Sequence, residues 1–193
     1  MKSTRLRSDE ITAIVERRKT IILRPLSVQP PDGFVFNGLS FASDKGLFMP
    51  PGALGTLNNK NSISLKPPYI PSQFYWVRER FAKVMGGEPF GYSVYKSGRE
   101  TTTLESSEII KEEELKWLHA SDMEEKYSRV AFKVTSVTAK HINDLSPTEM
   151  MQVGTGNFKV EWDLRYFKKG LDTEKNPLVW VIAIKAGVNG RWI

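Results

Sequence analysis

The sequence contains no cysteine and only two histidines among its 193 residues. Without cysteine the chain can form no disulfide, and it offers no thiolate to a metal ion or to a substrate. The two histidines, His119 and His141, lie far apart in the sequence and match no zinc-binding spacing. The sequence therefore predicts no metal site and no bound cofactor.

Long apolar runs are also missing from the sequence. The longest, residues 178–184, is far shorter than the ~20 residues that a helix needs to cross a bilayer. The amino terminus is basic, but Asp9 and Glu10 follow it where a secretory signal would have apolar residues. We therefore expect a cytoplasmic protein with no membrane partner.

The sequence does have an excess of positive charge, and this excess is unevenly spread. The formal net charge is +6, and residues 1–100 carry 15 Lys and Arg against 8 Asp and Glu. Residues 101–193 carry 13 against 14. Because clustered positive charge attracts phosphate-rich molecules, the first half of the chain indicates a nucleic acid or nucleotide partner.

Residues 8–16 have the pattern of a short amphipathic helix. Ile11, Ile14 and Val15 fall at helical spacing, and Ser8 or Asp9 can accept hydrogen bonds from the N–H groups of the first turn.

A cationic turn and a strand follow this helix. Residues 21–23 are apolar and β-branched or aliphatic, and Pro25 ends the strand because it has no N–H to donate. Arg17, Arg18 and Lys19 lie between helix and strand, where a helix dipole favours cations. The cluster has two interpretations: it caps the helix, or it binds an anionic ligand.

Two stretches have the composition of insertions. Residues 27–72 are rich in proline and glycine, which block helices and ladders, so we expect loops with at most short strands such as 34–36. Residues 104–126 contain a predicted acidic helix over 108–118, whose charged face is most simply solvated.

Residues 74–81 are rich in aromatic and β-branched residues and predict a strand, and a second strand is predicted over 91–95. Trp76, Arg78 and Arg80 share one face of the first strand. Two arginines beside an aromatic ring suit a stacked base with paired phosphates. The alternative is that Trp76 fills the core while the arginines meet water or Glu79.

The last third of the chain alternates strands and helices. Val130, Phe132 and Val134 predict one buried face of a strand that carries Lys133 on the other. A helix with a capping box is predicted from Ser146 to Gly154, and a near-continuous apolar strand over 178–185.

A further helix is predicted over residues 158–169, ending at Gly170. It packs Phe158 and Trp162, together with Leu164 or Phe167. Helices inserted between short strands, without a regular strand–helix–strand order, indicate an α+β domain or a small barrel.

Three segments, residues 17–25, 74–82 and 129–185, come in the order found in the ASCH domain, which the chain resembles in its long bacteriophage and prophage form. This domain belongs to the PUA-like superfamily of small β-barrels. The resemblance implies one domain over 1–193, a PUA-like barrel with flanking helices and a long Pro/Gly-rich loop insertion. It also implies a phage or prophage accessory protein in the cytoplasm of a bacterial host.

The family's N-terminal signature, GxKxxExR, aligns with Arg17, Lys19, Ile22 and Arg24, so its two cations are retained. The resemblance implies a cleft beside this motif that binds RNA or a nucleoside. We therefore predict an RNA- or nucleotide-binding module with a cationic cleft around Lys19. The expected ligand-binding residues are Arg17, Arg18, Lys19, Thr20, Arg24, Trp76, Arg78, Glu79 and Lys133.

Two alternatives follow from the same resemblance and from fold reuse. One ASCH branch hydrolyses the amide of acetylcytidine with a lysine, a threonine and a glutamate, which align here with Lys19, Ile22 and Val153. Neither Ile nor Val can move a proton. Lys19 could be catalytic alone only if burial and the adjacent Arg18 lowered its pKa, or with other groups after a shift in alignment. Such a shift would bring in Thr20, Glu149 or Gln152. The other alternative is a phage protein that binds a host protein through its long loops.

Overall fold

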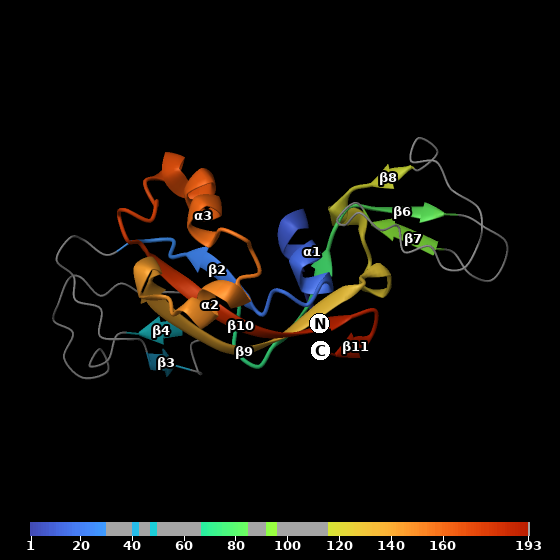
Figure 1. Cartoon of the computed structure of the whole chain (residues 1–193). Coiled ribbons are helices and arrows are strands. Elements are labelled where there is room, and N and C mark those ends of the chain that lie inside the picture. The colour runs from blue at the N-terminus through green and yellow to red at the C-terminus, as the bar shows by residue number, and fades with distance from the viewer. Residues whose placement is uncertain (30–39, 43–46, 50–66, 85–91, 96–115, 193) are drawn as a thin grey trace. The chain divides into compact units, whose positions relative to one another are not determined.

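The computed structural model describes residues 1–29, 40–42, 47–49, 67–84, 92–95 and 116–192 (Figure 1). Most of the two predicted insertions, including the strand expected over 34–36, lies outside these residues. Within the second insertion, Trp117–Leu118 form strand β8 where the acidic helix was expected to end. They pair with β6, so the helical prediction is wrong at these two residues.

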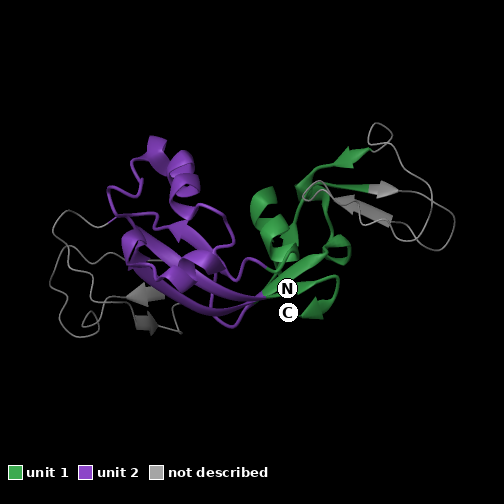
Figure 2. Cartoon of the chain, in the orientation of Figure 1, with its two compact units in different colours: residues 1–17, 74–132, 186–193 green, residues 18–73, 133–185 purple. Residues whose placement is uncertain are grey.

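The chain divides into two compact units, each built from separate segments (Figure 2). Unit 1 contains residues 1–17, 74–132 and 186–193, and unit 2 contains residues 18–73 and 133–185. The chain therefore passes from one unit to the other four times. The long strands β9 (Val130–His141) and β10 (Leu178–Val188) contribute residues to both units.

The fold class is α+β, as predicted. The main sheet has six strands in the hydrogen-bonded order β1-β5-β9-β10-β11, with β2 also paired to β10. It is mixed, because β1 (Lys2–Arg5) and β5 (Phe74–Arg78) are parallel whereas β2 (Ile21–Pro25) and β11 (Arg191–Trp192) are antiparallel to β10. Closure into a PUA-like barrel stays a prediction.

Two smaller sheets are described besides the main sheet. The pair β3 (Ser40–Ala42) and β4 (Leu47–Met49) forms one sheet, and β6 (Phe81–Val84), β7 (Tyr92–Tyr95) and β8 form another. Among the described ranges, no helix has the length and apolar character needed to cross a membrane.

Unit 1 has a small aromatic core beside its strands. Trp76, Phe81 and Met123 are buried together, and the Phe81 ring stacks on Tyr127 with centroids 5.7 Å apart. Trp76 is only 9% exposed, so of its two predicted roles the structure has it in the core. Tyr75, Trp76 and Val77 are consecutive and all buried, so both faces of β5 are covered at this point and Trp76 lies in the core.

Helix α1 (Ser8–Val15) is capped one residue before Ser8, the earlier of its two predicted caps, so the predicted cap is wrong. Arg7 occupies the cap position, and Glu10 Oε2 accepts a hydrogen bond from the Arg7 main-chain N–H at 3.3 Å. The predicted apolar stripe is confirmed at Ile11 and Ile14, both 1% exposed.

Unit 2 packs two helices, α2 (Pro147–Gln152) and α3 (Phe158–Tyr166), against its strands. Phe158, Trp162 and Tyr166 face the core at a spacing of four residues. Leu164 and Phe167 are 83% and 69% exposed, so the expectation that one of them packs in the core is wrong.

The ends of the unit 2 helices follow their sequence signals. Ser146 and Glu149 form the predicted capping box, with Ser146 Oγ accepting from the Glu149 N–H at 3.2 Å. Gly154 follows α2 with φ +78°, and Gly170 follows the 3-10 turn Phe167–Lys169 with φ +66°. Both glycines adopt the left-handed conformation that ends helices.

Candidate functional site

Unit 1 contains a cavity of about 650 Å³ at the carboxyl ends of β1 and β5. Leu6 and Ile11 give it an apolar wall, and Ser8, the first residue of α1, also lines it. The rest of the described lining is Ala120 and six charged or titratable residues: Arg5, Arg7, Arg78, Glu79, Arg80 and His119. We call this cavity the arginine pocket.

Strand pairing brings the arginines of the pocket together from distant parts of the sequence. Because β1 and β5 are parallel and in register, Arg5 lies directly opposite Arg78, and each is the last residue of its strand. Arg7 and Arg80 follow two residues later, the spacing that returns side chains to the same side of an extended chain. The pocket is therefore built from two Arg-x-Arg sequences on neighbouring strands.

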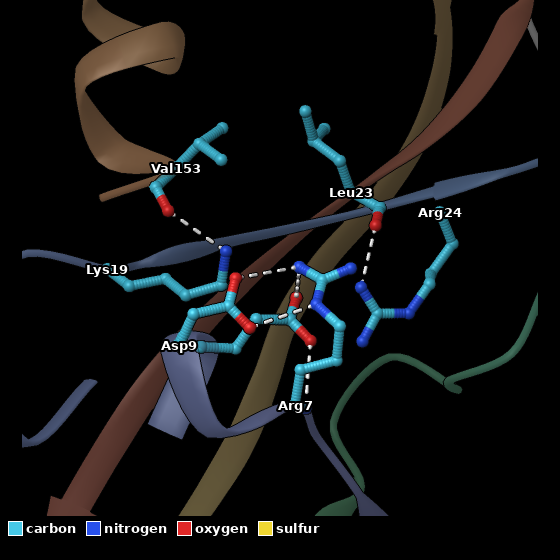
Figure 3. Close-up of polar contacts among 7 residues, drawn as sticks. Arg7, Asp9, Lys19, Leu23, Arg24 and Val153 are labelled. Carbon is cyan, nitrogen blue, oxygen red and sulfur yellow. Dashed lines mark hydrogen bonds and ion pairs between the residues drawn. The ribbon is translucent and has the colours of Figure 1, made fainter. Parts of the chain in front are cut away.

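Two of the charged lining residues, Glu79 and Arg7, already have ion-pair partners. Glu79 forms a bidentate ion pair with Arg129 within unit 1. Arg129 Nε donates to Glu79 Oε1 at 3.0 Å, and Arg129 Nη2 donates to Glu79 Oε2 at 3.1 Å. Both side chains are almost fully buried. Arg7 pairs with Asp9 at 3.0 Å (Figure 3). It also pairs with Glu10 at 3.4 Å. The charges of Arg7 and Glu79 are therefore already compensated.

Three arginines of the pocket, Arg5, Arg78 and Arg80, form no ion pair or side-chain hydrogen bond within the described part of the chain, and we call them uncompensated in that sense. The Nε of Arg78 is buried without a hydrogen-bond partner. A buried donor without a partner costs about 1–3 kcal/mol. Like charges directly opposite on paired strands are also destabilising. An anion in the pocket would relieve both costs.

Lys19, the centre of the predicted cleft, lies in unit 2 and is 2% exposed. Its Nζ donates a hydrogen bond of 2.9 Å to the main-chain oxygen of Val153, at the carboxyl end of α2 (Figure 3). Arg18 donates to the main-chain oxygen of Gly154, and the Thr20 N–H donates to Gln152 O at 2.9 Å. This segment therefore caps α2, where the helix dipole favours cations.

The other predicted site residues of the cationic stretch and of β9 are dispersed. Arg17 is exposed, with φ 61°, and Thr20 is also exposed. Arg24 is half-buried, and its Nη1 donates to Leu23 O at 2.8 Å (Figure 3). Lys133 is half-buried on β9. Of the predicted ligand-binding residues, Arg78 and Glu79 line the arginine pocket.

Of the charged or titratable lining residues, Arg5, Arg7 and His119 were missed by the sequence-based prediction, whereas Arg80 was predicted with Arg78 to suit a phosphate. A signal for Arg5 and Arg7 was present in the sequence, because Arg5-Leu6-Arg7 and Arg78-Glu79-Arg80 share the same Arg-x-Arg pattern. The pairing of β1 with β5, which joins the two patterns, is not visible in either segment alone.

The residues of the amidohydrolase alternative are engaged in structural contacts. Ile22 is fully buried on β2, and the Val153 carbonyl holds Lys19. Glu149 accepts from Lys140 Nζ at 2.8 Å and from the Ser146 main-chain N–H at 2.8 Å. Partial burial acts to raise the pKa of Glu149, but these hydrogen bonds outweigh it, so its pKa lies below the ordinary value.

Among the described residues, no group of three or more His, Cys, Asp or Glu side chains is placed to hold a metal ion. No family model, no curated protein and no solved structure matches this sequence. The arginine pocket is therefore the part of the described molecule in which residue chemistry and geometry indicate a ligand most directly.

Proposed function

We propose that this protein is an RNA- or nucleotide-binding module of the PUA-like, ASCH type, and that it binds phosphate in the arginine pocket. The observation that carries the proposal is the buried Nε of Arg78, which has no hydrogen-bond partner among the described residues, while Arg5 and Arg80 line the same cavity. Arginine binds phosphate oxygens through paired N–H groups, and it stays charged at any physiological pH.

The size and surroundings of the pocket support a nucleotide ligand. A volume of about 650 Å³ lies within the range of ~300–1,000 Å³ that is usual for small-molecule sites. The apolar wall of Leu6 and Ile11 gives a base or sugar a surface to contact, while the arginines hold the phosphate. The positive excess of residues 1–100 would attract a polyanion over longer distances.

A binding titration with matched arginine variants tests the proposal. The purified full chain is titrated with 5′-phosphorylated single-stranded RNA and with single-stranded DNA of the same sequence, at two salt concentrations. We expect affinity that falls as salt rises, and Arg78→Met to weaken binding by about tenfold or more, since a hydrogen bond to a charged group contributes roughly 1.5–3 kcal/mol.

Arg191→Met is the matched control, because Arg191 is an exposed arginine on β11 that does not line the pocket. It removes the same unit of charge, so we expect only a small loss of affinity. Equal losses in the two variants, or no salt-dependent binding by the unsubstituted chain, would overturn the proposal. The amidohydrolase hypothesis stays a separate prediction, tested by acetate release from acetylcytidine.

A further inference from the structure

The arginine pocket draws its arginines from neighbouring backbone positions on two paired strands. Neighbouring strands lie ~4.8 Å apart, and residues two apart on a strand are separated by ~6.6 Å. Arg5 lies opposite Arg78 in the register, and Arg80 comes two residues after Arg78, so the three uncompensated guanidinium groups start from backbone positions within this short span.

From this we infer that the arginine pocket binds a terminal phosphate, a phosphomonoester at the end of an RNA or on a mononucleotide, in preference to the internal diesters of a strand. The inference rests on the proposed function and names the part of the ligand that enters the pocket.

Terminal phosphates and internal diesters differ in their charge and in their number of free oxygens. A terminal phosphate carries about −1.5 to −2 charges at pH 7 and has three free oxygens that accept hydrogen bonds. An internal diester carries one negative charge and has two free oxygens. Three uncompensated arginines in one pocket match the first ligand and exceed what the second requires.

The cavity opens to solvent at Arg5, Arg80 and His119, which are exposed, so a chain end can enter it. Glu79 and Arg129 form their buried ion pair beside the pocket, and α1 begins at Ser8 on another side of it. The amino terminus of α1 adds a favourable dipole for an anion, although Asp9 and Glu10 in its first turn already offset part of it. Arg7 is bound to those two acids, so it orients this corner without adding net charge.

The test compares three RNAs of one sequence, which carry a 5′-phosphate, a 3′-phosphate or hydroxyl groups at both ends. Each is titrated against the full chain, and cytidine monophosphate and inorganic phosphate are added as competitors. We expect at least one terminal phosphate to bind tenfold or more tightly than the hydroxyl RNA, and the mononucleotide to compete. Which terminal phosphate binds identifies the preferred end.

Variants confirm that this preference belongs to the pocket. Arg5→Met and Arg78→Met should each reduce the preference for the phosphorylated end to less than threefold, while Arg191→Met should retain it. Arg5 is exposed, so its replacement keeps the test valid if Arg78→Met were to unfold. The unfolding midpoint of every variant is measured alongside.

The outcomes separate this inference from the proposed function. Equal, salt-sensitive and Arg78-dependent binding of all three RNAs would overturn the terminal-phosphate inference and leave the RNA-binding function standing. No salt-sensitive binding of any RNA or of the mononucleotide would overturn both. Binding of a phosphopeptide but of no RNA would also overturn both and would assign the pocket to a protein ligand.

Discussion

Arg78 lies on a strand that is part of the core of unit 1, yet it carries a polar group that the core does not satisfy. Its Nε is buried without a partner, and its charge lies opposite that of Arg5. Both features cost folding free energy, so the residue is explained by a ligand better than by stability. Functional sites commonly carry such a local cost.

We therefore predict that Arg78→Met leaves the free energy of unfolding unchanged or raises it by up to about 1 kcal/mol, because methionine removes the orphan donor and the like charge while retaining a long apolar chain. Urea unfolding in the absence of nucleotide measures this change. A loss greater than about 1 kcal/mol would show that the Arg78 guanidinium has a stabilising role, contrary to the argument for a ligand site.

For a single residue, the sequence predicts the kind of environment that its side chain favours better than it predicts which residue that side chain contacts. That Lys19 and its neighbours favour a helix carboxyl end was predictable from charge alone. The helix involved was not, because Lys19 binds Val153 O beyond α2, and not the helix that precedes it in the sequence. Such a contact depends on the tertiary fold.

At the scale of the elements, helix α2 contains a carboxylate whose ionisation affects the stability of the fold. Its first turn depends on Glu149, which accepts hydrogen bonds from Lys140 and from Ser146. Burial acts against ionisation, but these hydrogen bonds hold the pKa of Glu149 below its ordinary value of 4.5. Because the folded pKa is the lower one, protonation favours the unfolded chain. The ionised carboxylate therefore stabilises the fold above pH 4.5.

We predict that this stabilisation is lost as the pH falls from above 4.5 through the folded pKa of Glu149. The difference in unfolding free energy between the unsubstituted chain and Glu149→Gln should be largest near neutral pH and should shrink in that interval. Urea unfolding between neutral pH and pH 3 measures it. Lys140→Met, which removes the ion pair, should flatten the pH dependence of the chain. A constant difference would contradict this assignment.

The elements also show where periodicity predicts well and where it fails. Val130, Phe132 and Val134 are fully buried at every second position of β9, as the alternation predicted. In α3 the core-facing positions are four apart, and Leu164, two residues after Trp162, falls on the other side of the helix. Apolar character alone could not show that these positions are exposed.

At the scale of the whole molecule, the α+β class followed from local patterns, but the division into two interleaved units did not. The arginine pocket requires that β1 pair with β5 in a register that joins Arg5 and Arg78 across the chain. Local propensity in either strand carries no information about that register. The site was therefore predictable in its residue type and only partly in its members.

Interleaving predicts a specific effect of truncation on unit 1. Removing residues 186–193 deletes β11 and the edge-to-face contact between Trp192 and Phe74, whose ring centroids are 5.5 Å apart. We expect amides of β1 and β5 to exchange faster with solvent while those of β2 and α3 keep more of their protection. Hydrogen exchange measures both, with Trp192→Phe as the control that retains the strand. Equal acceleration in the two units would contradict the division.

Because the two units are interleaved in the sequence, the segments of unit 1 are synthesised at widely separated times. Residues 1–17 leave the ribosome well before β5, their strand partner, and before residues 186–193, which complete the same unit. At ~5–20 residues per second, roughly 10–35 s separate the first of these segments from the last. Until β5 emerges, roughly 4–15 s after β1 at the same rate, Arg5 and Arg7 are carried on a segment without its strand partner. During synthesis, Arg5 and Arg7 are therefore exposed to the polyanions of the cell before Arg78 and Arg80 emerge to complete the pocket.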